Sequence, residues 1–377
     1  MKVVIVGTAY PYRGGLSAFN ERLAVEYQQQ GHDVEIYTFT VQYPSFLFPG
    51  KTQYSTEPAP KGLKILRKVN SCNPLNWVKV GREIRRKKPD VLLTKYWLPF
   101  MAPCLGTIER IVRRNGKTHV VAILDNVIPH EHRIGDRLFS RYFVKSTACF
   151  VAMSRSVLSD LETFTTSKPR LFCPHPLYDH YGDIRPASEA KQALGLAPDM
   201  RYVLFFGFIR SYKGLDLLLR AFAESQVAEL NDVRLLVAGE FYGEAQPYLD
   251  IIASLGLENR VILRTEFIPD SRVRDYFCAS DLVAQPYKSA TQSGVTQIAY
   301  HFERPMLVTR VGGLPEMVPE GRVGYVVAPE VKTIAEAIAD FFTHDRFASM
   351  AEGVREEKKK YSWRSMTDAI KQLTDER

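Results

Sequence analysis

Two cations stand in a loop between a buried strand and a helix, where a phosphate group could be bound. An apolar run ends at Phe206, a helical pattern starts near Leu215, and Arg210 and Lys213 lie between them. Such a loop lies at the carboxyl end of a strand and beside the positive end of a helix dipole. We therefore expect these two cations to hold a diphosphate. The alternative is that both charges are simply solvated, as most charges in loops are.

Two further loops between a strand and a helix carry glycine or hydroxyl groups. Gly14 and Gly15 precede a helix, but their loop matches neither the dinucleotide nor the P-loop fingerprint. Ser293, Gly294 and Val295 open another helix, whose backbone N–H groups would suit a phosphate or a sugar. Each loop has an alternative interpretation, a tight turn for the two glycines and an ordinary N-cap for the serine.

A third group of candidate residues follows the apolar run that ends at Leu124. Asp125 stands at the carboxyl end of this strand, where a carboxylate without a partner would be costly, so we expect a functional role. His130 could bond a sugar hydroxyl, and Glu131 could accept or orient an acceptor proton. A capping or turn role is the alternative for His130.

Short apolar runs alternate with helical patterns along both halves of the chain. In the first half these runs lie at 3–6, 34–39, 91–93, 120–124 and 149–153. The alternation predicts the α/β class, with parallel sheets covered by helices on both faces. We expect two Rossmann-like, doubly wound domains at 1–178 and 201–360, joined by a polar linker region at 179–200 and followed by a last helix at 361–377.

The composition is that of an ordinary globular protein in a reducing compartment. The chain has 377 residues, of which 45% are hydrophobic and 24% charged, so disordered, collagen-like and coiled-coil proteins are excluded. The five cysteines are scattered and form no C-x-x-C pair, which argues against a disulfide framework or a metal site. No apolar run reaches about 18 residues, so we expect a cytoplasmic or peripheral protein.

Positive charge is concentrated in one block of the first half. Residues 51–117 hold 16 Lys and Arg against 4 Asp and Glu, whereas residues 191–377 hold 23 against 26. This block could face phosphates, an acidic substrate or an anionic membrane surface. Nucleic acid is excluded as a partner, because only the isoelectric point favours it and no binding motif accompanies it.

A basic amphipathic helix within this block predicts either membrane contact or ordinary packing. Trp77, Val80 and Ile84 share one helical stripe beside several cations, and the apolar segment 97–101 follows. A peripheral membrane face would use both groups of residues. Alternatively, the apolar stripe packs on the sheet and the cations are solvated, which is the commoner case for a single helix.

The order and spacing of these pieces resemble the GT-B glycosyltransferases, in particular the retaining family 4, also described as glycosyl transferases group 1. The resemblance is carried by segments at 14–15, 126–131, 154–156, 207–214, 237–240, 267–270, 280–281 and 312–316. Ser362 and Trp363, which open the last helix, also resemble the start of the family's crossing helix.

The resemblance implies two Rossmann-like domains facing a cleft, with the donor bound by the second domain, the acceptor by the first, and the C-terminal helix crossing back to the first. It implies that Arg210 and Lys213 neutralise the donor diphosphate without a metal, so no cofactor is expected beyond the nucleotide sugar. The other donor-binding residues that it implies are Gly14, Gly15, Glu240, Phe267, Ile268, Ser293, Gly294 and Val295.

The chain departs from the family at a pair of glutamates. Many members carry two, eight residues apart, but this chain has no carboxylate between Asp281 and Glu303. Gln292 and Gln297 stand close to the two positions and are the expected neutral substitutes.

The function implied is transfer of a hexose-type sugar from a nucleoside-diphosphate sugar to a hydroxyl acceptor with retention. The acceptor would be a lipid-linked glycan or a related molecule of cell-surface polysaccharide or glycolipid synthesis, at the inner face of the cell membrane. The missing glutamates favour an alternative, a catalytically weak partner or scaffold protein with the same fold.

Overall fold

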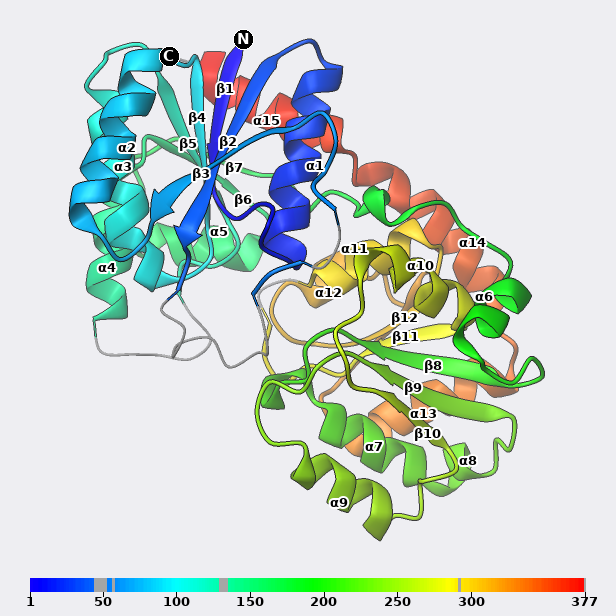
Figure 1. The fold of residues 1–377 in the computed structure, drawn as a ribbon. Coiled ribbons are helices and arrows are strands. Elements are labelled where there is room, and N and C mark those ends of the chain that lie inside the picture. The colour runs from blue at the N-terminus through cyan, green and yellow to red at the C-terminus, as the bar shows by residue number, and fades with distance from the viewer. Residues whose placement is uncertain (44–52, 56–57, 129–134, 291–292, 376–377) are drawn as a thin grey trace. The chain divides into compact units, whose positions relative to one another are not determined.

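A computed structural model describes residues 1–43, 53–55, 58–128, 135–290 and 293–375 (Figure 1). The chain forms two compact units, Met1–Pro176 together with Tyr361–Arg377, and Leu177–Lys360. Each unit contains a parallel sheet flanked by helices (Figure 1). The predicted α/β class, the two Rossmann-like domains and the return of the C-terminal helix to the first domain are confirmed.

The first domain is built on a seven-stranded sheet of order β3-β2-β1-β4-β5-β6-β7. Its strands are β1 (Lys2–Val6), β2 (Asp33–Val41), β3 (Lys64–Asn70), β4 (Val91–Tyr96), β5 (His119–Leu124), β6 (Cys149–Ala152) and β7 (Arg170–Phe172). Its helices are α1 (Gly15–Gln29), α2 (Pro74–Lys87), η2 (Pro99–Met101), α3 (Ala102–Arg113), α4 (Asp136–Ser146), α5 (Arg155–Glu162) and α15 (Trp363–Asp375).

The two edge strands of this sheet were not predicted. The inner strands β1, β4 and β5 are buried almost throughout, and each contains an uninterrupted apolar run that makes it visible in the sequence. The edge strand β3 carries exposed lysine and arginine, and β7 has only three residues. Charged and short edge strands limit pairing with other chains, but they hide the strand from an apolar pattern.

The C-terminal helix α15 is part of the first domain's core. It packs against α1 and the strands β5 to β7. Trp363 at its start is buried, and its ring lies 5.1 Å from that of Phe19. The guanidinium of Arg22 lies 5.3 Å from the centroid of the Trp363 ring.

The apolar stripe of α2 packs inside the first domain. Val80 and Ile84 are buried, and the indole N–H of Trp77 donates a hydrogen bond of 2.8 Å to the Asn70 carbonyl. The segment at 97–101 likewise packs on this core, with Trp97 donating to the Tyr43 hydroxyl at 2.6 Å. The packing interpretation therefore holds for the apolar residues.

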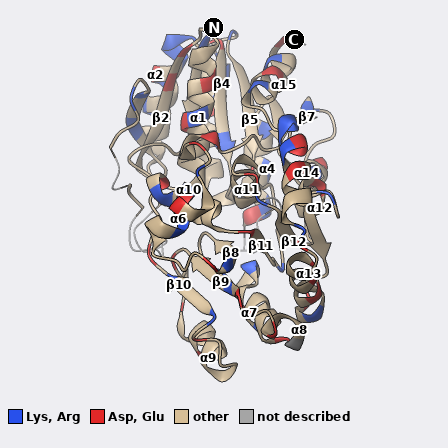
Figure 2. Cartoon of the chain, turned by 90° about the vertical axis from the view of Figure 1, so that its right-hand side faces the viewer, with Lys and Arg blue, Asp and Glu red and all other residues tan. Residues whose placement is uncertain are grey.

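The cations of α2 lie on the opposite, exposed face of the helix. Figure 2 shows Lys and Arg side by side with few acidic residues on α2. The exposed ones on this helix and at its end are Lys79, Arg82, Arg85, Arg86 and Lys88. Other cations of the block are paired within the domain, because Glu35 binds both Lys64 and Lys87, and Asp90 lies 2.9 Å from Lys117.

The second domain has a six-stranded parallel sheet of order β10-β9-β8-β11-β12-β13. Its strands are β8 (Arg201–Phe206), β9 (Val233–Ala238), β10 (Val261–Arg264), β11 (Leu282–Gln285), β12 (Met306–Thr309) and β13 (Gly324–Val327). Its helices are η3 (Asp179–Tyr181), α6 (Ala187–Leu194), η4 (Ser211–Lys213), α7 (Leu215–Ala223), α8 (Ser225–Ala228), α9 (Gln246–Ser254), α10 (Asp270–Ala279), α11 (Gly294–His301), α12 (Leu314–Met317), α13 (Val331–Thr343), α14 (Phe347–Glu357) and η5 (Lys358–Lys360).

The segment expected as a linker region is folded into this domain. Residues 179–200 contain η3 and α6, and α6 packs closely on α10. Arg185, just before α6, is held to the buried Asp275 of α10 by an ion pair of 2.5 Å. The polar composition of this segment thus reflects ion pairing on the surface of the domain.

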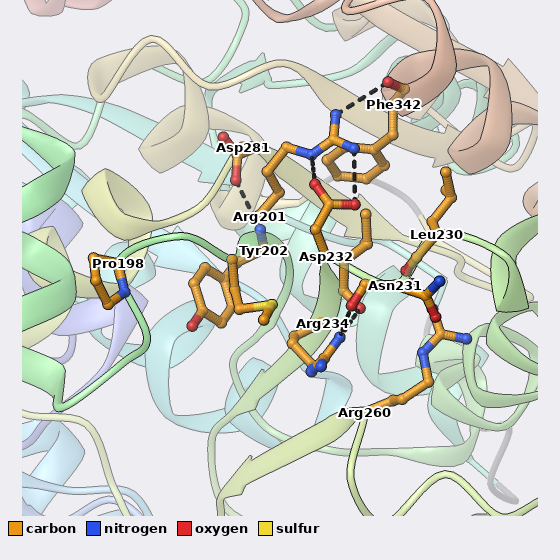
Figure 3. Close-up of polar contacts among 12 residues, drawn as sticks. Pro198, Arg201, Tyr202, Leu230, Asn231, Asp232, Arg234, Arg260, Asp281 and Phe342 are labelled. Atoms are coloured by element: carbon orange, nitrogen blue, oxygen red, sulfur yellow. Dashed lines mark hydrogen bonds and ion pairs between the residues drawn. The ribbon is translucent and has the colours of Figure 1, made fainter.

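Polar contacts fix the amino ends of the central strands of this sheet (Figure 3). Arg201 binds both carboxylate oxygens of Asp232, at 2.6 and 3.1 Å, and donates to the Phe342 carbonyl at 3.0 Å. The Tyr202 N–H donates to Asp281 at 2.7 Å, while burial raises the pKa of that carboxyl. The opposite, carboxyl ends of the strands carry the loops that contain the candidate residues.

Candidate functional site

The loop after β8 is held in one conformation by glycines and by the loop after β11. Gly207 and Gly214 have φ values of 94° and 70°, in the left-handed region that favours glycine. A Cβ atom at Gly214 would lie 1.9 Å from the Pro286 carbonyl oxygen, so no larger residue fits. The Lys288 N–H donates to the Tyr212 carbonyl at 2.7 Å. Two loops that are distant in sequence are thereby fixed side by side.

Arg210 and Lys213 lie in this loop, partly buried and close to aromatic rings. The Arg210 guanidinium lies 3.5 Å from the centroid of the Tyr242 ring. The Lys213 ammonium lies 5.6 Å from the centroid of the Tyr287 ring and 3.2 Å from where a Cβ of Gly207 would stand. Within the part of the chain that the structure describes, neither cation forms an ion pair. An anion bound here would supply the missing negative charge.

The electrostatic environment of Lys213 is unfavourable for a charged amine. Burial, with the nearby positive charge of Arg210, lowers the pKa of Lys213 to about 8. Both effects act in the same direction, because each disfavours the charged form. A bound diphosphate would offset both effects and raise the pKa of the amine again.

The start of α11 lies against the same loop. A methyl carbon of Val295 is 3.9 Å from where a Cβ of Gly207 would stand. Ser293 is buried at the N-cap position, but its hydroxyl is 3.2 Å from the Tyr287 hydroxyl and does not cap the helix. The structure thus brings Ser293 and Val295, which flank Gly294, together with Lys213. A helix start without a side-chain cap is suited to an anion.

Two buried glutamine side chains near this helix lack hydrogen-bond partners. Both amide atoms of Gln297 are unpartnered although the side chain is fully buried. The amide nitrogen of Gln285 at the end of β11 is also unpartnered, while its oxygen accepts from the Thr296 hydroxyl at 3.1 Å. Buried amides without partners are rare and need an explanation, such as a bound ligand or water. Gln292 lies outside the described residues.

Backbone hydrogen bonds join Glu240 to the loop after β8, which contains Arg210 and Lys213. The Ile209 N–H donates to the Glu240 carbonyl at 2.8 Å, and the Tyr242 N–H donates to the Ile209 carbonyl at 2.9 Å. Phe267 and Ile268 follow β10, which is two strands away from β8 in the sheet. Neighbouring parallel strands lie about 4.8 Å apart, so Phe267 and Ile268 lie about 10 Å from the end of β8 along the same edge of the sheet. Their expected contact with the base stays a prediction.

Gly14 of the first domain is the N-cap residue of α1. Its φ of 95° lies in the region that favours glycine, and its carbonyl accepts the first hydrogen bonds of the helix, from the N–H groups of Ser17 and Ala18 at 3.0 and 3.1 Å. The helix start accounts for Gly14, and Gly15 is the first residue of the helix. An anion contact at Gly14 and Gly15 remains a prediction.

Asp125 has a cation partner that the sequence did not indicate. Its carboxylate oxygen Oδ1 lies 3.0 Å from the Nζ of Lys95, which is the fifth residue of β4 and is almost fully buried. The expectation that this carboxylate needs a partner is met by Lys95. His130 and Glu131, the other expected residues of this region, lie outside the described residues.

Lys95, Gln285 and the two tyrosines beside the cations were missed from the sequence. Lys95 and Gln285 each stand inside or at the end of an apolar strand, where a long polar side chain is unusual. This contrast between a polar side chain and its apolar neighbours could have identified both residues from the sequence. Tyr242 and Tyr287 could not be identified in this way, because aromatic residues are common near strand ends.

Neither a metal cluster nor a membrane span is found in the described parts of the chain. There, no group of three or more His, Cys, Asp or Glu side chains could hold a metal ion. None of the helices in those parts is both long enough and apolar enough to cross a membrane.

Comparison with known proteins identifies the class. Residues 13–172 match the family model "Glycosyltransferase Family 4", and residues 200–344 match "Glycosyl transferases group 1". Sucrose-phosphate synthase from Thermosynechococcus elongatus has the same fold, with a TM-score of 0.76 at 15% identity, over 100% of this chain and 98% of that one. HepE of Anabaena, in complex with UDP and glucose, gives a TM-score of 0.74 at 16% identity, with both chains fully covered. The protein is therefore a GT-B glycosyltransferase.

More specifically, the chain belongs to the family 4, group 1 glycosyltransferases, as the two matched domains show. A curated relative is D-inositol 3-phosphate glycosyltransferase of Mycobacterium marinum, 34% identical over 189 residues. The match covers 48% of this chain and only 40% of the relative's length. These findings favour an enzyme over the partner-protein alternative.

The lowered pKa of Lys213 predicts that binding of a nucleoside diphosphate depends on pH. The free amine loses its proton as the pH rises through about 8, and the anion favours the protonated form. Affinity for UDP should therefore be constant near pH 7 and fall above pH 8, by up to about tenfold per pH unit. Calorimetric titrations between about pH 7.5 and pH 9 measure this, because over that range the terminal phosphate of UDP is almost fully ionised and its uracil ring is still mostly neutral.

A Lys213→Arg variant is the control, because arginine stays charged over this range. Its affinity for UDP should not change with pH, whatever its absolute value. The same decline in both proteins would contradict this role of Lys213.

Proposed function

We propose that the protein transfers a hexose-type sugar from a nucleoside-diphosphate sugar to a hydroxyl acceptor, with retention at the anomeric carbon. The observation that supports this most is the pair of cations, Arg210 and Lys213, which form no ion pair with the carboxylates that the structure describes and lie beside the start of α11, where the Ser293 side chain does not cap the helix. Within the described residues, this is a place where two phosphates could be neutralised by the protein alone.

The reaction that we propose requires charge stabilisation more than a strong base. The bond between the anomeric carbon and the diphosphate oxygen breaks, and the acceptor oxygen forms its bond to that carbon on the same face. The acceptor proton passes to the leaving diphosphate. Negative charge grows on the diphosphate as the bond breaks, so fixed cations lower the barrier. A site with two cations and few acids suits this chemistry.

The donor to test first is a UDP-sugar. The chain of HepE that shares the fold was solved in complex with UDP and glucose. The Gln297 amide, whose two polar atoms find no partner among the described residues, could bond a donor hydroxyl in place of one of the family's glutamates, and the unpartnered amide nitrogen of Gln285 could donate a further hydrogen bond. A neutral amide both donates and accepts, whereas a carboxylate only accepts, so the preferred sugar can differ from that of glutamate-bearing relatives.

The acceptor that we propose carries negative charge or is attached to an anionic membrane. Positive charge is concentrated in the first domain, and the related enzymes named above act on D-inositol 3-phosphate, itself an anion. A lipid-linked glycan used in cell-surface polysaccharide or glycolipid synthesis meets both conditions. The protein would then work at the inner, cytoplasmic face of the cell membrane.

The membrane surface that we propose combines the exposed cations of α2 with apolar residues of the same domain. Leu75 at the start of α2 is 82% exposed, and Leu138 on α4 is 67% exposed. Arg137 and Arg141, also exposed, flank Leu138 on α4. Apolar side chains inserted among anionic headgroups, with arginines around them, are typical of peripheral binding.

Loss of the Lys213 charge should abolish most of the transfer. We expect Lys213→Ala to lower kcat/KM for the UDP-sugar about 10²- to 10³-fold, the usual effect of removing one group that stabilises developing charge. Sugar transfer is measured by release of UDP in the presence of acceptor. Lys332→Ala is the matched control, since this lysine of the same domain is 82% exposed and lies on α13. Equal activity of the two variants would contradict the proposal.

Membrane binding is tested with vesicles of defined composition. The protein should pellet with phosphatidylglycerol vesicles at low salt and much less with phosphatidylcholine vesicles or at high salt. A triple variant, Arg82→Ser, Arg85→Ser and Arg86→Ser, should lose most of this binding. Negligible pelleting with both lipids would contradict the proposed membrane binding and would leave the proposed donor site untouched.

A further inference from the structure

The loop after β8 continues the pairing of β8 with β9 beyond the ends of both strands. The Gly207 N–H donates to the Ala238 carbonyl at 2.9 Å, and Ile209 forms a parallel bridge with Phe241. A Cβ atom at Gly239 would lie 2.3 Å from the Gly207 carbonyl oxygen, so the two loops are in close contact there. Backbone pairing therefore holds the two loops next to each other.

This pairing places Tyr242 on the same side of the two loops as Arg210. Successive residues of an extended chain point to opposite sides, and the side chain of Ile209 is buried in the core of the domain. Arg210, the next residue and also extended, therefore points away from the core, as does Tyr242, which follows the bridge residue Phe241. The Arg210 guanidinium carbon consequently lies 3.5 Å from the centroid of the Tyr242 ring.

Arg210 contacts the face of this ring. At so short a distance an edge-on guanidinium would push its nitrogen atoms into the ring, so the planar group lies flat on Tyr242. The ring of Phe208 meets that of Tyr242 at an interplanar angle of 68°, with 5.9 Å between the centroids. This edge-to-face contact limits the rotation of the tyrosine ring. Arg210 therefore rests on a ring that is itself held in place.

Stacking orients Arg210 without using its hydrogen-bond donors. All N–H groups of a guanidinium lie in its plane, whereas the ring contacts only its face. Within the described residues, the Arg210 side chain forms no ion pair or hydrogen bond that would take up these donors. A carboxylate in the place of the ring would also hold the arginine, but it would neutralise its charge and occupy two donors. An aromatic ring leaves both the charge and the donors to an anion.

We propose that Tyr242 is a positioning residue, which holds the Arg210 guanidinium flat and presents its N–H donors to the phosphates of the nucleotide sugar. This inference rests on the proposed function, because it concerns the same diphosphate site. The negative face of the ring also counteracts the repulsion between Arg210 and Lys213. The ring of Tyr287, whose centroid lies 5.6 Å from the Lys213 ammonium, is an aromatic neighbour of the second cation.

A purely structural role for Tyr242 leads to a different expectation. The ring would then only pack against Phe208, and its loss would loosen the loop and weaken nucleotide binding whether or not Arg210 is present. A positioning role acts through Arg210 alone, so it disappears once the guanidinium is removed. A double-mutant cycle on Tyr242 and Arg210 separates the two roles.

The test is the affinity for UDP, measured by calorimetry with EDTA present, over this cycle. We expect Tyr242→Leu, which keeps an apolar side chain but lacks the aromatic face, to weaken binding about three- to thirtyfold. Tyr242→Phe should bind UDP within about twofold of the wild type, because the aromatic face is retained. In an Arg210→Gln background, Tyr242→Leu should cause no further loss.

Tyr248→Leu is the matched control. Tyr248 is a partly exposed tyrosine of the same domain, its ring lies 5.5 Å from that of Phe241, and among the described residues it stacks on no cation. Its replacement should leave the affinity for UDP unchanged. An unchanged affinity in Tyr242→Leu, or an equal loss with and without Arg210, would overturn the inference.

A measurement on the wild type applies even if Tyr242→Leu does not fold. The Nε–H proton of Arg210, assigned by NMR through comparison with Arg210→Lys, should resonate upfield of the ordinary arginine position, because the ring current shields protons above the aromatic face. An ordinary position would show that the stacking is absent in solution and would overturn the inference.

Neither measurement needs catalysis, so failure of the inference is distinguishable from failure of the proposed function. A protein that binds UDP with the expected coupling between Tyr242 and Arg210, but transfers no sugar, would overturn the proposed reaction and support the inference. Sugar transfer without this coupling would support the proposed function and overturn the inference.

Discussion

Two positive charges that lie close together, with no ion pair to a carboxylate among the described residues, are the constraint on which the proposed donor site depends. Arg210 and Lys213 occupy one short loop, and burial together with the charge of Arg210 lowers the pKa of Lys213, which makes the charged amine unfavourable in the free protein. The fold tolerates it because glycines at 207 and 214 allow the loop's conformation and the loop after β11 closes against it. A bound anion would offset the repulsion between Arg210 and Lys213. The two cations are therefore unfavourable in the free protein but would stabilise a complex with an anion.

The charges of the two halves of the chain are arranged differently, and under the proposed function this would divide their tasks. From residue 191 onward the chain has slightly more acidic than basic residues, so a donor phosphate would have to be attracted by individual cations and not by a general positive field. The first domain carries much of the basic surplus on the exposed face of α2, and among its described residues the buried Lys95 is paired with Asp125. A positive surface on this domain suits the anionic acceptor or membrane that we propose.

Much of the fold was predictable from the sequence, because buried parallel strands are continuous apolar runs. The strands that escaped, β3 and β7, lie at sheet edges, where charge or shortness removes that pattern. The position of Arg210 and Lys213 in the loop between β8 and α7 was predictable, because the apolar run before them and the helical pattern after them mark the ends of this loop. Lys95 was not, since its partner is 30 residues away and only the pairing of β4 with β5 brings them together. Among the described residues, the Gln297 amide has no hydrogen-bond partner. This depends on how the domain packs, so it could not be predicted from the sequence either.

The central claim is that Arg210 and Lys213 bind a nucleoside diphosphate without a metal ion. Calorimetric titration of UDP, GDP and ADP into the 377-residue chain, with EDTA present, tests it most directly. The account predicts saturable binding of at least one of the three with a stoichiometry of one, and its loss in the Arg210→Ala, Lys213→Ala double variant. Binding that survives in the double variant, or that requires a divalent cation in the wild type, would contradict it.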